Sequence, residues 1–170
     1  LLELSGLVTH IQRKGFRVTL YTETQIRHLY MLRAELEAYC IRQVAEMPDL
    51  SALVAELTTQ HEAIVAAMGR LDGRGFIAAS RDFYLAAARF TGNAPLTSML
   101  GKVYEQIEPL RHMLASTSLE ANKIPIYTEG VIQALRVRDF DHAAALTRKY
   151  VVQVLPDIVR AYREASLDDA

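Results

Sequence analysis

The sequence predicts an all-α protein, an antiparallel bundle of about six helices preceded by a short β-hairpin. Apolar residues recur at three- and four-residue spacing through most of the chain, which is the period of an amphipathic helix. Only five prolines and eight glycines interrupt the 170 residues, and this favours long helices over many short strands. A hydrophobic content of 51% supplies enough apolar surface for one globular core.

The first 21 residues follow a different pattern from the rest of the chain. Residues 1–4 are typical of the last turn of a helix that ends at Gly6. Two short alternating segments, residues 8–12 and 16–20, then flank Arg13-Lys14-Gly15, which indicates a hairpin with a basic tip. A chain that opens in the final turn of a helix is expected to continue a preceding segment. We therefore expect two parts, residues 1–21 and a helical domain over residues 22–170.

The first two predicted helices carry the polar residues of most interest in the N-terminal half. A capping box at Thr22–Gln25 opens a helix that runs to about Met47. The spacing of this helix places Arg33 and Glu37 on its buried face as an i,i+4 pair. The second helix runs from about Leu50 to Leu71. Its apolar face is formed by Leu50, Leu53, Val54, Leu57, His61, Ile64, Val65 and Met68. We expect His61 to be a core histidine with one hydrogen bond.

The third predicted helix, residues 76–93, places two hydroxyl groups inside an apolar face. Ser80 and Tyr84 lie one turn apart among phenylalanine and alanine side chains. Gly92 ends the helix, because glycine accepts the left-handed conformation, and residues 72–75 are expected to form the turn before it. The hydroxyl pair is either a satisfied detail of the core or the wall of a cavity.

Three more helices complete the expected bundle. The fourth follows Pro95, with Leu96, Met99, Leu100, Val103, Ile107, Leu110 and Leu114 on its inner face. After a polar connection over residues 116–123, a shorter helix covers about 125–137. Asp139 caps the last helix, and Pro156 is expected to kink or interrupt it.

Composition excludes several classes of protein. A net charge of -1 gives no basic surface over the whole chain, so any nucleic-acid binding must be local. The single cysteine, Cys40, excludes an internal disulfide and fits a reducing compartment. The chain contains no apolar run long enough to span a bilayer and does not start as a signal peptide, so we expect a soluble, cytoplasmic protein.

Four short patterns, taken in order, resemble the GntR family of bacterial transcription regulators, in particular its FadR-type branch. SGLVTHIQRKGFRV is similar to the end of a winged helix-turn-helix. LYMLRAELE matches the Arg-x-x-Leu-Glu pattern of the first effector-domain helix at Arg33 and Glu37. FYLAAARFTGN resembles the family's Phe-His followed eight residues later by Gly-Asn. VIQALRVRDFDHAAAL resembles the closing Ala-Leu…Asp…Ala pattern of the C-terminal helices.

The resemblance implies that residues 1–21 are the remnant of a winged helix and that residues 22–170 are a helical, FCD-like domain that binds an effector and dimerises. Arg13, Lys14 and Gly15 would then lie along operator DNA. They would add salt-sensitive affinity with little sequence specificity. The expected partners are operator DNA, a second copy of the chain and a small organic acid.

Metal-binding members of the family hold a divalent ion at four positions, which correspond here to Ser80, Tyr84, Thr128 and Tyr150. None of the four is a histidine or a carboxylate, and neutral hydroxyls are poor ligands for such an ion. We therefore expect no metal or other cofactor. We expect instead an effector site formed by these hydroxyls and Arg33, whose guanidinium suits a carboxylate.

Other interpretations stay open from the sequence. The four hydroxyls could simply bond backbone carbonyls in the core, and Arg33 with Glu37 could be a purely structural ion pair. The alternative function is a helical-bundle enzyme that depends on a metal or cofactor. The chain has no nucleophile–base pair, Glu-x-x-His motif or Gly-rich phosphate loop to support it. A third possibility is a helical scaffold without a ligand, in which side chains would fill the centre.

Overall fold

The computed structural model describes residues 8–11, 15–18, 21–117 and 123–168. Within these residues it confirms the predicted all-α bundle of six helices. The helices are α1 (Glu23–Gln43), α2 (Ser51–Gly69), α3 (Gly73–Phe90), α4 (Ala94–Thr117), α5 (Ile124–Arg136) and α6 (Phe140–Asp168). A short 3-10 helix, η1 (Val44–Glu46), extends α1.

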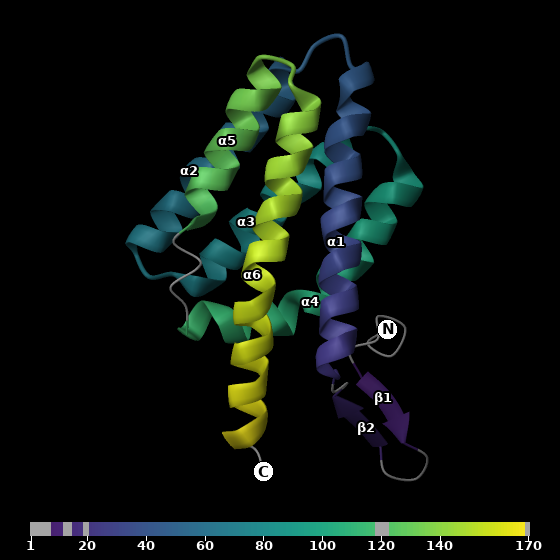
Figure 1. Cartoon of the computed structure of the whole chain (residues 1–170), viewed down its shortest axis with the longest axis vertical. Helices are drawn as coiled ribbons and strands as arrows, with labels where there is room; N and C mark the ends of the chain where they lie inside the picture. Colours follow the sequence, from purple (N-terminus) through teal and green to yellow (C-terminus); the bar gives the residue numbers. More distant parts are fainter. Residues whose placement is uncertain (1–7, 12–14, 19–20, 118–122, 169–170) are drawn as a thin grey trace.

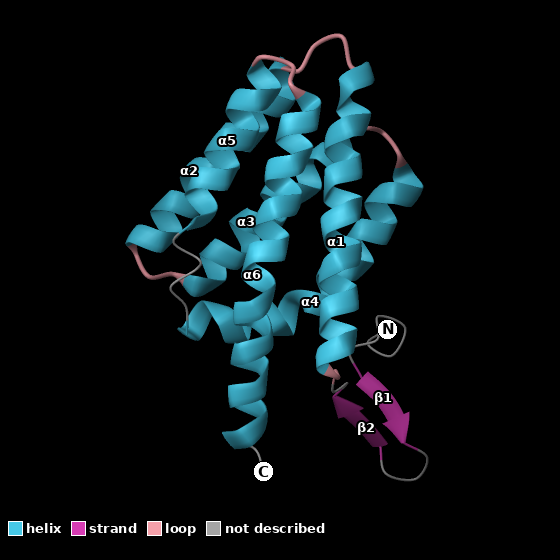
Figure 2. Cartoon of the chain, in the orientation of Figure 1, coloured by secondary structure: helices cyan, strands magenta, loops and turns pink. Residues whose placement is uncertain are grey.

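Two short strands precede the bundle. β1 (Val8–Ile11) and β2 (Gly15–Val18) pair antiparallel, with Val8 opposite Val18 and Ile11 opposite Gly15. They lie beside the N-terminal end of α1, at the same end of the bundle as the end of α6 (Figure 2). Of the expected basic tip, Gly15 is the first residue of β2, whereas residues 13 and 14 lie outside the described residues.

α1 and α6 run antiparallel, side by side, along the long axis of the molecule (Figure 1). α1 also packs against α3 and α4, and α6 packs against α4 and α5. α2 completes the bundle by packing against α3 and α5. Five of the six helices, all except α2, therefore surround one common centre, where buried side chains of α1, α3, α4, α5 and α6 meet.

Local sequence signals set the helix ends. Thr22 and Gln25 form the predicted capping box, in which the Gln25 backbone N–H donates to Thr22 Oγ1 at 3.2 Å and the Thr22 N–H donates to Gln25 Oε1 at 2.8 Å. Gly92 adopts the left-handed conformation after α3, with φ of 67°. Asp139 Oδ1 accepts the backbone N–H of His142 at 3.0 Å and so caps α6, as expected.

One prediction about helix boundaries is wrong, and of the kink or interruption expected at Pro156 the interruption is absent. Residues 73–75 are the first turn of α3 and not a separate turn, because the Asp72 side chain accepts the backbone N–H of Gly75 at 2.9 Å and starts the helix there. α6 also passes through Pro156 without interruption. Leu155 and Ile158 beside this proline are buried against the bundle, and this packing outweighs the one lost hydrogen bond.

Leu114 lies outside the residues whose side chains the structure describes; among the other predicted inner residues, the stripes hold with two exceptions. Val65 and Met99 are 46% and 58% exposed, respectively, although the spacing placed both inside. The largest fully buried side chains include Tyr30, Tyr104 and Phe83, so the centre of the bundle is aromatic. None of the helices in the described parts of the chain is long and apolar enough to cross a membrane.

Candidate functional site: a charged cavity in the bundle

A buried ion pair lies at the centre of the bundle. Arg33 and Glu37 follow each other by one turn on α1 and are 3% and 1% exposed. Arg33 Nε donates to Glu37 Oε1 at 2.7 Å, and the Tyr104 hydroxyl of α4 donates to the same oxygen. This confirms the buried pair that the sequence predicts. Because both charges are removed from water, each depends on the other for stabilisation.

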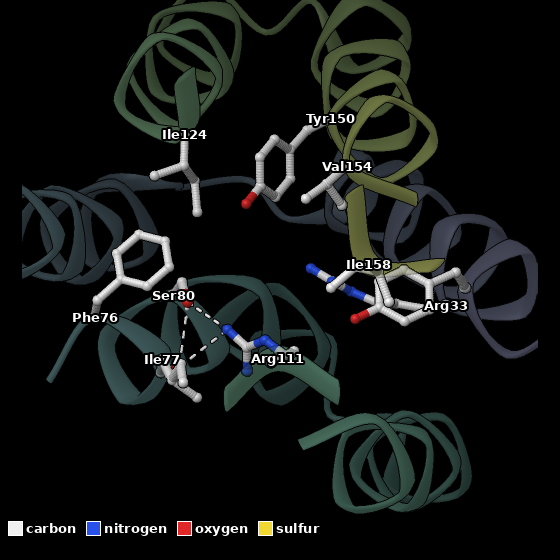
Figure 3. Close-up of a pocket in the computed structure, with 10 residues that line it drawn as sticks. Arg33, Phe76, Ile77, Ser80, Arg111, Ile124, Tyr150, Val154 and Ile158 are labelled. Carbon is white, nitrogen blue, oxygen red and sulfur yellow. Dashed lines mark hydrogen bonds between the residues drawn. The ribbon is translucent and has the colours of Figure 1, made fainter. Parts of the chain in front are cut away.

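A second buried guanidinium, that of Arg111 on α4, lies close to this pair. Its Nη2 donates to the backbone oxygen of Ile77 at 3.0 Å and to Ser80 Oγ, both on α3 (Figure 3). Among the described residues, Arg111 has no acidic partner, and its buried Nη1 has no hydrogen-bond partner at all. At the centre of the bundle, two guanidinium groups therefore lie near one carboxylate, that of Glu37, which balances only one of the two positive charges. The other buried carboxylate among the described residues, Asp157, pairs with Arg160 on the same helix.

Aromatic rings surround Arg33. Its Cζ lies 5.7 Å from the ring centre of Tyr30, 5.5 Å from that of Tyr84 and 5.1 Å from that of Tyr104. Arg111 lies 5.3 Å from the Tyr104 ring, so this ring contacts both cations. The negative faces of the rings partly replace the water that the two cations lose on burial.

Burial and charge shift the pKa values of these groups in different directions. Burial alone lowers the pKa of Arg33, but the neighbouring Glu37 carboxylate outweighs it and raises this pKa well above its usual value. Burial, with the nearby charge of Arg33, lowers the pKa of Arg111. An arginine starts so high that both remain charged at neutral pH. Burial raises the pKa of Tyr30 to about 12, so its hydroxyl is neutral.

A cavity of about 20 Å³ opens beside these groups. Its polar lining comes from Arg33, Ser80, Arg111, Tyr30 and Tyr150, and its apolar lining comes from Phe76, Ile77, Ile124, Val154 and Ile158. Figure 3 shows the Tyr150 hydroxyl and the Arg33 guanidinium pointing toward the space next to Ser80 and Arg111. The volume suffices for about one water molecule, so a larger guest must displace side chains of the wall.

The structure brings three of the five expected effector-site residues to this cavity. Arg33, Ser80 and Tyr150 line it, from α1, α3 and α6. Tyr84 does not line it. Its ring packs behind the wall, parallel to the Tyr150 ring at 6.0 Å, and its buried hydroxyl has no partner among the described residues.

Thr128, the fifth expected residue, faces α2 instead of the cavity. Its Oγ1 lies 2.8 Å from His61 Nδ1 and also bonds the backbone oxygen of Ile124 at 3.1 Å. His61 Nε2 lies 3.5 Å from Glu129 Oε2. His61 is partly buried, with a side chain that is 17% exposed, and it contacts two residues of α5 instead of making the single hydrogen bond that was expected of a core histidine.

The four hydroxyl positions do not fit a divalent metal. Ser80 Oγ already accepts a hydrogen bond from a guanidinium, whose positive charge opposes a second cation at this place. Thr128 is bonded to His61 and to the backbone. In the part of the chain that the structure describes, no three His, Cys, Asp or Glu side chains gather closely enough to hold a metal ion.

The sequence reasoning missed Arg111 and Tyr30 as site residues. Arg111 lies four residues after Ile107 and seven after Tyr104, which places all three on the buried face of α4. This spacing was a usable signal. An arginine at the edge of an apolar stripe is usually solvated, however, and only the packing of α3 on α4 decides otherwise.

Fold and site together define a helical domain with a buried cavity of net positive charge, the kind of architecture that suits a sensor of small molecules. The model of the FCD domain matches residues 28–153. This match covers most of the chain, which therefore belongs to the FCD-domain family. A search of curated protein sequences found no significant match.

Several solved structures share the fold. McbR/YncC of E. coli has a TM-score of 0.84 at 19% identity, over 94% of this chain and 80% of that one. A GntR-type regulator from Rhodococcus sp. RHA1 gives 0.72 at 17% identity, over 92% and 74%. A GntR family member from Pseudomonas syringae pv. tomato str. DC3000 gives 0.69 at 14% identity, over 99% and 70%.

Proposed function

We propose that this FCD domain binds a small organic anion in the cavity between Arg33, Arg111, Ser80 and Tyr150. The observation that carries the proposal is the imbalance of charge: two buried guanidinium groups face a single carboxylate, that of Glu37, among the described residues. A buried cation without a counter-ion is costly, and a bound anion removes this cost. An organic acid is the natural ligand for such a site because guanidinium pairs strongly with carboxylate.

The binding event would control DNA recognition by a shift in population. In this proposal the domain forms a homodimer in the cytoplasm, and each subunit carries a winged helix of which residues 1–21 are the last part. Arg13, Lys14 and Gly15, which the sequence predicts to be a basic tip, then lie along the DNA backbone. The effector favours one arrangement of the two subunits, and thereby changes how well the paired winged helices fit a two-fold operator.

We propose that the protein is a repressor and that binding of the effector relieves the repression. The cavity is water-sized in this structure, so ligand entry requires the helices around it to move, and such movement is the source of coupling to the wing. α1 connects the two directly, because it follows the wing in sequence and carries Arg33.

A thermal-shift screen of organic acids tests the effector part of this proposal. At least one acid should raise the melting temperature in a concentration-dependent way, and the same acid should change the affinity of the full-length dimer for its operator. Arg148→Met is a suitable control, since this arginine is 47% exposed and does not line the cavity. A protein whose melting temperature responds to no organic anion would contradict the proposal.

A further inference from the structure

We infer that Arg111, and not Arg33, binds the effector's anionic group, and that the effector is a monocarboxylate with an apolar body. The inference rests on the proposed function and names the ligand class and the binding residue of the same site. Three observations carry it: the pairing of the two arginines, two unpartnered polar atoms, and the chemistry of the cavity wall.

The two arginines differ in how their charge is balanced. Arg33 donates from Nε to the Glu37 carboxylate at 2.7 Å and forms an almost fully buried ion pair with it. Arg111 donates only to neutral acceptors, the Ile77 carbonyl and the Ser80 hydroxyl. Ser80 in turn donates to the same carbonyl at 3.2 Å, which holds the guanidinium against α3. A ligand anion gains most from the cation that has no anion of its own.

Two polar atoms of the cavity's lining residues lack partners. Arg111 Nη1 and the Tyr30 hydroxyl are both buried, and among the described residues neither has a hydrogen-bond partner. The two residues are close enough for the charge of Arg111 to act on the pKa of Tyr30. A carboxylate has two acceptor oxygens, so one carboxylate accepts from both groups: N–H from Arg111 and O–H from Tyr30.

The count of charges limits the ligand to one negative charge. Arg33 and Arg111 contribute two positive charges, Glu37 contributes one negative charge, and the tyrosines are neutral. A monoanion therefore completes the balance, whereas a dianion leaves a carboxylate without a partner in an apolar surrounding. The rest of the lining is an apolar wall formed by Phe76, Ile77, Ile124, Val154 and Ile158. This wall favours a hydrocarbon body behind the carboxylate.

The test compares three probes of the same length: butyrate, succinate and butyramide. Isothermal titration of the wild-type protein should show butyrate binding at least ten-fold more tightly than succinate, which adds a second charge, or butyramide, which has none. A wild-type protein that binds succinate or citrate more tightly than butyrate overturns the inference and leaves the proposed function intact. A protein that binds no organic anion overturns the proposed function itself.

Three variants identify the binding residue. Arg111→Met removes a buried charge without a counter-ion, so the free protein should melt at the same temperature or higher, while butyrate affinity falls at least thirty-fold. Arg33→Met leaves Glu37 unpaired and should lower the melting temperature. Arg111→Lys keeps the positive charge but loses the planar guanidinium that can bind a carboxylate through two N–H groups, so it should retain intermediate affinity. Wild-type affinity in Arg111→Met, or in Arg111→Lys if the methionine variant does not fold, overturns the assignment of Arg111.

Discussion

Arg33 and Glu37 are joined by a hydrogen bond of 2.7 Å between Nε and Oε1, in a place where both side chains are almost completely removed from water. The Tyr104 hydroxyl donates to the same oxygen, so three side chains of α1 and α4 form one connected group. A buried pair of this kind contributes little compared with an apolar pair of the same size, but it strongly penalises the loss of one partner. The stability of the bundle should therefore respond asymmetrically to changes at these two positions.

Replacing one member of the pair should cost more than replacing both. We expect Glu37→Leu alone to lower the free energy of unfolding by about 3–5 kcal/mol, because it leaves the Arg33 charge buried and unpaired. The double variant Arg33→Met/Glu37→Leu should recover at least half of this loss. Urea unfolding of the wild type, the two single variants and the double variant measures these free energies as a double-mutant cycle. Additive losses in the double variant would show that the two side chains act independently.

Tyr30→Phe and Tyr84→Phe form a pair that separates stability from binding. Both hydroxyls are buried without a partner among the described residues, so each substitution should stabilise the free protein by about 1 kcal/mol. Only Tyr30 lines the cavity, so only Tyr30→Phe should weaken butyrate binding. Thermal unfolding and calorimetric titration measure the two effects. Equal loss of binding in both variants would place Tyr84 in the site as well.

Cys40 should be unreactive in the folded protein. The thiol is fully buried, and burial together with the nearby Glu37 charge raises the pKa of Cys40 to about 12. It is the chain's single cysteine, so labelling with a thiol reagent at pH 8 reports directly on opening of the core. Labelling should follow the urea unfolding transition. Rapid labelling without urea would mean that α1 opens locally.

The raised pKa of Cys40 also predicts the direction in which the free energy of unfolding changes at high pH. The unfolded thiol loses its proton near pH 9, whereas the folded thiol keeps it to about pH 12, so the folded state binds more protons between these values. The free energy of unfolding should therefore fall as the pH rises from 9 to 12, and Cys40→Ala should reduce the slope. Urea unfolding at several pH values in this range compares the two proteins. A slope that is the same in both would contradict the shifted pKa.

Phe76 should control which acids fit. Of the residues that line the cavity, it alone is partly exposed. Phe76→Ala opens the wall toward solvent, so we expect octanoate to gain at least ten-fold in affinity relative to butyrate. Phe90→Ala is the control, because Phe90 is also partly buried on α3 but does not line the cavity. Competition calorimetry measures both. A shift of equal size in the two variants would rule out Phe76 as the entrance.

The wing should contribute salt-dependent affinity for DNA. In the full-length protein, Arg13→Ala/Lys14→Ala should weaken binding to specific and non-specific DNA by similar factors. It should also lower the slope of log affinity against log salt by about one to two units, since about one counter-ion is released per phosphate contact. Fluorescence anisotropy at four salt concentrations gives this slope. An unchanged slope would remove these residues from the DNA contact.

The sequence by itself determined the six helices, the capping box at Thr22, the cap at Asp139 and the burial of Arg33 with Glu37, because each depends on residues within one or two turns of one another. Helical period fixes which face of a helix is buried. It does not fix which neighbour that face meets. Only the tertiary structure decided that Arg111 bonds Ser80, 31 residues away, and that Thr128 bonds His61, 67 residues away. The first contact holds the second cation at the cavity, and the second contact turns Thr128 away from it. Local spacing indicates which residues are buried, but it does not identify partners that lie this far apart in the sequence.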